Sequence, residues 1–145
     1  MYRKILVALD TTATDQSLLP HIGDLARLCG SELLLVHVAD GWVARNYEQL
    51  NLAESEEMRE DRAYLESAAV RLAESGLTVR THLALGDPAA EILKIAGAEQ
   101  CDLIAMTTHG HRLIGDLVYG STIEKVRHEA RIPMLIVRAA KGDRP

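Results

Sequence analysis

The sequence is poor in aromatic residues: it contains no phenylalanine, one tryptophan and four tyrosines among 145 residues. The core of such a chain must be built from aliphatic side chains, and a surface of stacked aromatic rings for single-stranded nucleic acid is not expected. Basic residues are also in the minority, because 16 lysines and arginines stand against 21 aspartates and glutamates and the net charge is −5. That charge repels a polyanion over most of the surface, so we expect no nucleic-acid partner.

Cysteine and long apolar runs are scarce as well. The two cysteines, Cys29 and Cys101, stand in neither a CxxC nor a metal-ligand pattern, so we expect free, buried thiols and a reducing compartment. No apolar run approaches the ~18 residues that a membrane span requires, and the N-terminus MYRKILVALD shows no signal-peptide pattern. We therefore predict a cytoplasmic protein with no membrane partner.

Short apolar segments alternate with helical patterns along the whole chain. The expected strands are 4–9, 33–38, 77–85, 102–106 and 133–137, and the third of them alternates apolar and polar residues like a strand near a sheet edge. The expected helices are one that Thr12 and Asp15 begin as a capping pair, a long amphipathic one over 54–75, one after Gly86-Asp87-Pro88, and one from about Ser121 to Glu129. This order predicts an α/β fold of the flavodoxin or Rossmann type, with an open parallel five-stranded sheet, helices on both faces, and a single domain over 1–145.

The stretch 102–122, DLIAMTTHGHRLIGDLVYGST, predicts a phosphate-binding loop. A strand-like run leads into a connection with three glycines, and the last glycine precedes the tetrad STIE, which has the form of a capping box with Ser121 as N-cap. A helix N-terminus offers unpaired N–H groups and the positive end of the helix dipole, so a glycine just before it lets an anion approach. Glycine loops are also common in α/β proteins that bind no nucleotide, and the loop alone leaves that alternative open.

Other candidate residues fall at the same edge of the expected sheet. Ligands of parallel α/β sheets bind beyond the carboxyl ends of the strands, at the switch point next to the first strand. Asp10 ends the first strand, Val38 ends the second, and the loop 107–120 follows the fourth. The alternative for Asp10 is a residue that only caps the following turn. Residues 41–53 have no clean period, and we expect them to form a loop able to fold over a ligand.

Basic and histidine residues of the glycine loop are candidates for phosphate or metal binding. Arg112 is the candidate cationic partner of a phosphate, and its alternative is a solvated loop arginine. His109 and His111 form an H-x-H pair that would need a third ligand such as His128 to hold a metal, and no spacing fixes that ligand. We therefore predict no protein-held metal and expect any Mg²⁺ to arrive with a nucleotide. His37, inside a strand run, is interpreted as a structural histidine.

Six segments, in chain order MYRKILVALD, ELLLVHVAD, GDPAAEIL, CDLIAMTTHGH, GSTIEKV and IPMLIVR, resemble the universal stress protein family, and the resemblance covers nearly the whole chain. The nucleotide-binding subgroup of that family carries G-x2-G-x9-G-[S/T] between the fourth strand and the fourth helix. Gly110 and Gly120-Ser121 keep the last two glycines and the hydroxyl at this spacing. Thr107 occupies the first glycine position, and its β-branched side chain fills space near the expected nucleotide that a glycine would leave free.

The resemblance implies a sheet of strand order 3-2-1-4-5 and a bound adenine nucleotide: ATP, ADP or AMP. It implies that Asp10 bonds the ribose or the adenine edge, that Ala8 and Leu9 line the base, and that Val38 offers its backbone groups to the adenine. Near the phosphates it places Thr107, Gly110, His111, Arg112, Gly120, Ser121 and Thr122. It also implies a homodimer through the last strand, from Pro133 to Val137, which agrees with the need of an apolar edge strand for cover.

Together these patterns favour an ATP-binding stress-response sensor or regulatory module whose regulatory protein partners the sequence does not identify. No GxxxxGK[ST] loop, placed general base or carboxylate pair for catalytic Mg²⁺ is present in the sequence, so turnover, if any, should be slow. Two alternatives stay open. One is a dimeric interaction module in which Thr107 blocks the pocket. The other is a slow ATPase or phosphotransferase with Ser121 or Thr122 as phosphoacceptor.

Overall fold

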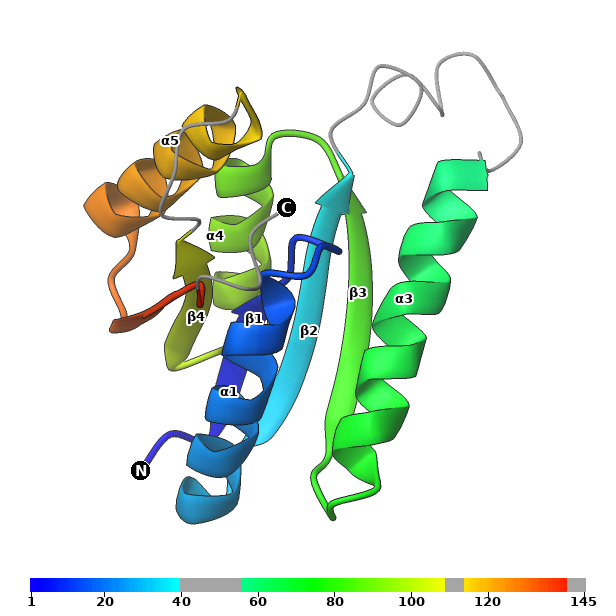
Figure 1. Ribbon diagram of the computed structural model, residues 1–145. Helices are drawn as coiled ribbons and strands as arrows, with labels where there is room; N and C mark the ends of the chain where they lie inside the picture. Colours follow the sequence, from blue (N-terminus) through cyan, green and yellow to red (C-terminus); the bar gives the residue numbers. More distant parts are fainter. Residues whose placement is uncertain (40–55, 109–113, 141–145) are drawn as a thin grey trace.

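A parallel sheet with helices on both faces forms the framework of the computed structural model, which describes residues 1–39, 56–108 and 114–140, and of 114–120 the backbone only. The elements are β1 (Lys4–Ala8), α1 (Asp15–Cys29), β2 (Glu32–Ala39), α3 (Glu56–Ala73), β3 (Val79–Leu85), α4 (Pro88–Ala98), β4 (Leu103–Thr108), α5 (Ile114–Glu129) and β5 (Met134–Arg138) (Figure 1). The strand order is β3-β2-β1-β4-β5 and every pair is parallel. The predicted α/β fold with order 3-2-1-4-5 is confirmed.

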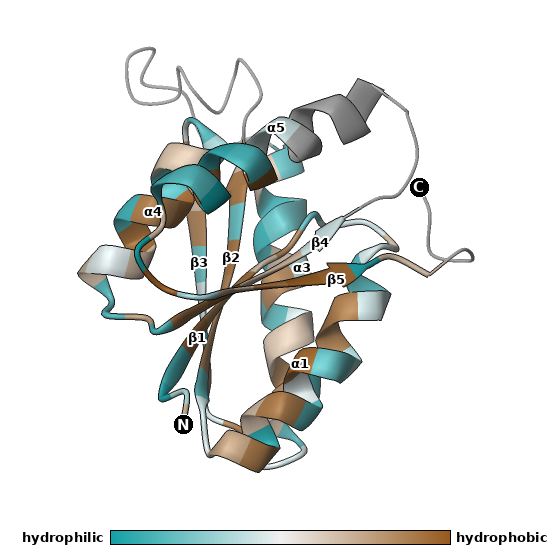
Figure 2. Ribbon diagram, turned by 90° about the vertical axis from the view of Figure 1, so that its left-hand side faces the viewer, coloured by the Kyte–Doolittle hydropathy of each residue, from teal (hydrophilic) through white to brown (hydrophobic). Residues whose placement is uncertain are grey.

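Two helical layers cover the sheet, α1 and α3 on one face and α4 and α5 on the other (Figures 1 and 2). Side chains of successive strand residues point to opposite faces. Ile5 therefore packs with Leu18 in the core under α1 and α3, whereas Leu6 packs with Val126 in the core under α4 and α5. Burial on both faces explains why the inner strands are continuous apolar runs, which Figure 2 shows as brown ribbons.

Several local predictions are confirmed by the structure. The alternating strand β3 lies at one edge of the sheet. Pro88 opens α4, and the Asp87 carboxylate caps it by accepting the Ala90 N–H at 2.9 Å. Gly30 ends α1 in the left-handed conformation with φ of 69°, and its N–H donates to the carbonyl of Ala26. None of the described helices has both the length and the apolar character needed to cross a membrane.

The predicted start of α1 is wrong. Thr14, not Thr12, is the N-cap residue, and its side chain makes no capping hydrogen bond. The Asp15 carboxylate instead accepts the N–H groups of Asp10 and Thr11, on the incoming turn. The reason is the backbone of Thr11, whose φ of 62° is left-handed and bends the chain so that these N–H groups meet the first helical side chain.

The predicted start of α5 is also wrong, because the helix begins at Ile114 and Ser121 lies inside it. Ser121 therefore forms no N-cap, and Gly120 stands in a helix interior, where glycine costs about 1 kcal/mol relative to alanine. The residues before the motif, 114–120, are themselves helical, so no free helix end remains at Ser121 for a cap to serve. The connection from β4 is accordingly shorter than the sequence pattern suggests.

The two thiols differ in burial. Both cysteines are free, with Cys101 buried and Cys29 partly exposed. The expectation of buried thiols is thus confirmed for Cys101 and wrong for Cys29, because Cys29 is the last residue of α1, where the helix leaves the core.

Candidate functional site

The carboxyl ends of β1 and β2 form the centre of the candidate site. The N–H of Leu9 donates to the carbonyl of Val36 at 2.8 Å, and β1 ends there while β2 continues to Ala39. Alternate residues of a parallel strand direct their backbone groups to opposite neighbours. Val38 therefore directs its N–H and C=O to the same side as Val36, beyond the end of β1.

Asp10 lies in the turn between β1 and α1 and takes part in its hydrogen bonds. Its Oδ2 accepts the hydroxyl of Thr14 at 3.1 Å, and its N–H donates to Oδ1 of Asp15 at 3.0 Å. The turn-capping interpretation therefore describes one of the contacts of this carboxylate. Asp10 is half-buried, so part of the residue remains accessible to solvent.

The carboxylate of Asp15 lies beneath this turn, and its residue is 0% exposed. It accepts three hydrogen bonds: from the Asp10 N–H, from the Thr11 N–H at 2.9 Å, and from the hydroxyl of Tyr64 on α3 at 2.7 Å. Burial raises the pKa of Asp15 to about 6, against the opposing effect of these donors. The turn that carries Asp10 is thus built around a buried acid.

His37 joins β2 to both β1 and α3. Its Nδ1 lies 2.7 Å from the carbonyl oxygen of Leu9, so Nδ1 carries the proton and donates it. Its Nε2 lies 3.5 Å from Oδ2 of Asp61. Burial raises the pKa of Asp61, and the charge of His37 opposes that rise. Both ring nitrogens have partners, which agrees with the interpretation of His37 as a structural histidine.

Thr107, near the carboxyl end of β4, has a buried hydroxyl. The residue is 5% exposed, and its Oγ1 has no hydrogen-bond partner within the part of the chain that the structure describes. Ala105 belongs to the core under α1 and α3, so Thr107, two residues on, faces the same layer. A buried hydroxyl without a partner is costly, and a ligand or water atom at this edge would satisfy it.

The structure brings together a part of the predicted site residues. Ala8, Leu9, Asp10, Val38 and Thr107 meet at the carboxyl edge of the sheet. Gly110, His111 and Arg112 lie outside the described residues, as do His109 and the predicted loop 41–53. Gly120, Ser121 and Thr122 lie within α5, with Ser121 exposed and Thr122 buried.

Two residues of this site were missed by sequence reasoning. Asp15 was interpreted as half of a capping pair, and Tyr64 lies 49 residues from Asp15 in the chain, on a helix whose pattern indicates only an amphipathic face. The one local signal for this site was Asp15 itself, an acidic residue that follows Asp10 closely in the sequence. Nothing local indicates that a tyrosine would reach it.

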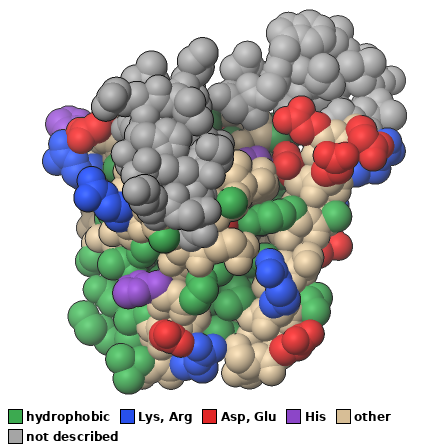
Figure 3. Space-filling model, in the orientation of Figure 1, with side chains coloured by type: hydrophobic (Ala, Val, Ile, Leu, Met, Phe, Trp, Pro, Cys, Tyr) green, Lys and Arg blue, Asp and Glu red, His purple; other side chains and the backbone are tan. Residues whose placement is uncertain are grey.

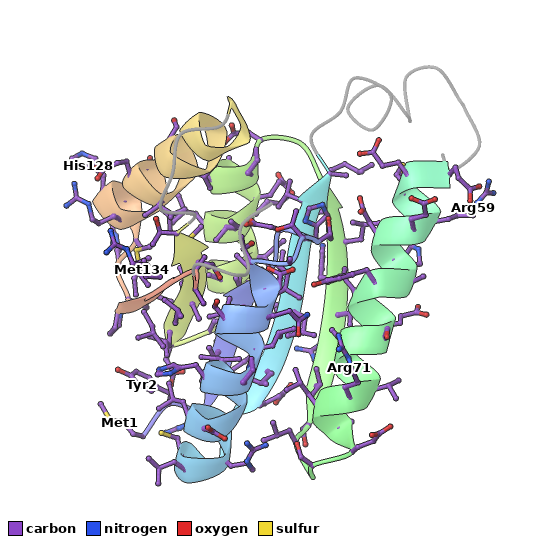
Figure 4. The ribbon with its side chains drawn as sticks, viewed as in Figure 1. Met1, Tyr2, Arg59, Arg71, His128 and Met134 are labelled. Atoms are coloured by element: carbon purple, nitrogen blue, oxygen red, sulfur yellow. The ribbon has the colours of Figure 1, made fainter. Side chains whose placement is uncertain are left out.

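The exposed acids of α3 form no part of the site. Figure 3 shows acidic side chains gathered at the N-terminal end of this helix, where Glu56 and Glu57 occupy the first turn. Arg59 pairs with Glu56 at 2.8 Å and points away from the sheet (Figure 4). These exposed side chains form a solvated face, whereas Asp61 on the same helix is mostly buried and lies 3.5 Å from His37. In the ranges 1–39, 56–108 and 114–140, no three histidine, cysteine or acidic residues cluster in a way suited to a metal ion.

Comparison with known proteins identifies relatives that align with nearly the whole chain. Universal stress protein MJ0577 of Methanocaldococcus jannaschii is 27% identical, with 95% of this chain and 96% of that protein aligned. Its solved structure, at 30% identity, covers 97% of this chain and 99% of its own with a TM-score of 0.81. A universal stress protein of Methanothermobacter thermautotrophicus is 31% identical, with 95% and 97% aligned.

A more distant structure, the universal stress protein of Archaeoglobus fulgidus in complex with dAMP, is 22% identical and has a TM-score of 0.68 over 94% of this chain and 98% of its own. That likeness shows the fold alone. The model of the universal stress protein family matches residues 1–138, which include every described strand and helix. With this match and the observed strand order, the chain belongs to the universal stress protein family.

Proposed function

We propose that this chain binds an adenine nucleotide, either ATP, ADP or AMP, and acts as a stress-response sensor or regulatory module. The observation that carries the proposal is the convergence of three unlike polar groups at one edge of the sheet: the Asp10 carboxylate, the backbone of Val38 and the buried hydroxyl of Thr107. Ligand sites of open α/β sheets lie at such an edge, next to the first strand.

Each group suits a different part of a nucleotide. The backbone N–H and C=O of Val38 match the donor and acceptor on the adenine edge. Ala8 and Leu9, at the end of β1, remain the predicted apolar neighbours of the base. The Asp10 carboxylate accepts hydrogen bonds from ribose hydroxyls. The Thr107 hydroxyl lacks a partner among the described residues and would gain one from the ligand.

The phosphates are assigned to the connection between β4 and α5. Gly110, His111 and Arg112 shortly precede α5 in the sequence, and a helix N-terminus attracts phosphate. The residues farther along this helix, Gly120, Ser121 and Thr122, remain predicted phosphate contacts. Any Mg²⁺ would enter with the nucleotide. The Archaeoglobus fulgidus relative that holds dAMP supports an adenine ligand for this fold.

The same proposal includes the setting in which the protein acts. We propose a single domain over 1–145 and a cytoplasmic location, which the two free cysteines support. We further propose a homodimer through β5, because this strand lies at an edge of the sheet and Ile136 is 40% exposed on it.

Isothermal titration with ATP, ADP and AMP tests the nucleotide site. We expect saturable binding by the wild type, and about tenfold weaker binding, or about 1.4 kcal/mol, in Asp10→Asn, which keeps the shape of the side chain but removes its charge. Asp24→Asn, at an exposed position of α1, is the matched control and should bind like the wild type. Absence of heat with all three nucleotides, together with no nucleotide in the purified protein, would refute the proposal and favour the interaction-module alternative.

A further inference from the structure

Helix α3 is joined to the turn at the end of β1 by two chains of polar contacts, called here the two relays. Both relays end on residues 9–11, the segment that carries Asp10. They start from Asp61 and Tyr64, which lie three residues apart and therefore on the same face of α3. Neither Asp61 nor Tyr64 belongs to the proposed nucleotide contacts.

The first relay passes through Asp15. The hydroxyl of Tyr64 donates to Oδ2 of Asp15 at 2.7 Å, and this oxygen also accepts the N–H of Thr11, while Oδ1 accepts the N–H of Asp10. Because Asp15 is fully buried, water cannot replace a lost donor without a change in the turn. The tyrosine hydroxyl therefore helps to hold the carboxylate that orients two consecutive backbone amides.

The second relay passes through His37. Oδ2 of Asp61 lies 3.5 Å from Nε2 of His37, and Nδ1 of the same ring donates to the carbonyl of Leu9 at 2.7 Å. Because Nδ1 donates to a carbonyl, Nε2 can bond Asp61 only as a second N–H donor or as the acceptor of a proton held by Asp61, and in either case the contact orients the ring. This relay thus fixes the carbonyl of Leu9, one residue before Asp10.

Helix α3 is also attached to the sheet by apolar contacts. Leu65 and Ala68 are buried in the core under α1 and α3, and Met58 is buried against Ala39 at the end of β2. The relays therefore serve the geometry of residues 9–11 more than the attachment of the helix.

We propose that Tyr64 and Asp61 are positioning residues of the adenine-nucleotide site, which couple α3 to that site by holding residues 9–11 through Asp15 and His37. This inference rests on the proposed function of the same edge. It assigns α3 a regulatory role: a partner or modification that displaces this helix would loosen the turn and lower the affinity for the nucleotide, and a bound nucleotide would in return stabilise the position of α3.

Tyr64→Phe, which removes one oxygen and leaves the ring, tests the first relay. Tyr2→Phe is the matched control, since Tyr2 packs against the same core but lies near the N-terminus of the chain (Figure 4). We expect ATP to bind Tyr64→Phe about tenfold more weakly and Tyr2→Phe within about twofold of the wild type. Native-state hydrogen exchange of the Asp10 and Thr11 amides, without nucleotide, should be about tenfold faster in Tyr64→Phe alone, with the Leu35 amide unchanged.

These measurements separate the inference from the function on which it rests. Failure of the wild type to bind nucleotide would overturn the proposed function and the role of the relays with it. If the wild type binds nucleotide, and Tyr64→Phe has the same affinity and the same amide exchange rates as the wild type, this inference alone would be overturned. Asp61→Asn tests the second relay should Tyr64→Phe not fold. It should weaken ATP binding about threefold, and an affinity equal to that of the wild type would count against the coupling.

Discussion

At the scale of single residues, Asp15 is an acid held in the interior by its neighbours. Three donors favour its charged form, yet removal from water outweighs them, and the pKa of this carboxyl rises from 3.8 to about 6. Tyr64 carries the complementary effect, because burial and the nearby Asp15 raise the pKa of its hydroxyl and keep it a donor. Within this pair, Asp15 is therefore the group that gains or loses a proton in the acidic pH range.

This shift predicts a dependence of stability on pH. Between about pH 4 and 6 the folded protein holds a proton on Asp15 that the unfolded chain has released, so the contribution of this group is fully present below about pH 4 and is lost as the pH rises through 6. The full shift corresponds to roughly 3 kcal/mol. The free energy of unfolding of the wild type, minus that of Asp15→Asn, should fall by up to this amount between pH 4 and 7.

Urea titrations at several pH values measure this difference. Asp24→Asn, which changes an exposed carboxylate on the same helix, is the control variant. Parallel stability curves for the wild type and Asp15→Asn would show that the Asp15 carboxyl titrates alike in the folded and unfolded chain.

At the scale of elements, α4 and α5 show that a capping motif acts only where the helix begins. Asp87 is a true N-cap with a bond to the Ala90 N–H, whereas Ser121, which has the sequence form of a capping box, lies within α5. Loss of a capping side chain leaves a helix-terminal N–H without its partner and costs about 1 kcal/mol. Loss of a serine hydroxyl inside a helix has no such effect.

We expect Asp87→Ala to lower the free energy of unfolding by about 1 kcal/mol and Ser121→Ala to leave it unchanged or raise it by about 0.5 kcal/mol, because alanine is the better helix former. The pair of Lys125 with Asp87, at 3.6 Å, is exposed and adds little. Urea unfolding at pH 7 measures both variants. A larger loss for Ser121→Ala than for Asp87→Ala would contradict the observed start of α5.

At the scale of the whole molecule, the two edges of the sheet differ in character. The β3 edge exposes polar side chains, Arg80, Thr81 and His82, which discourage pairing with another sheet. The β5 edge presents an apolar strand, with Ile136 exposed and its neighbours Leu135 and Val137 only half-buried. This asymmetry favours the β5 edge as the site where a second copy of the chain would pack.

The proposed dimer predicts that Ile136→Glu yields a monomer, because a carboxylate at the centre of an apolar interface is left without a partner. His82→Glu places the same charge on the β3 edge and should leave the dimer intact. Sedimentation equilibrium of the three proteins measures this difference. A monomeric wild type, or a dimer that survives Ile136→Glu, would exclude association through this strand.

Sequence patterns predicted those features that follow from local signals or from burial. The inner strands appear as apolar runs because both faces are covered, and β3 mixes polar with apolar residues because that strand lies at an edge and is covered less. Asp87-Pro88 marks the start of α4 because a cap and the following residue act within one turn. The pattern also indicated Asp10 and Val38 as candidate site residues, since both stand where an apolar run ends.

The sequence by itself determined the class of fold, the strand order through its resemblance to the family, and the edge at which a ligand is expected. Only the tertiary structure decided where α1 and α5 begin and which groups support Asp10. A cap motif acts only at a free helix end, and the motif at Ser121 does not encode whether the residues before it, 114–120, are helical as well. The bond from Tyr64 to Asp15 joins positions 49 residues apart, and no local pattern records such a contact because it exists only once the sheet has brought α3 beside the turn.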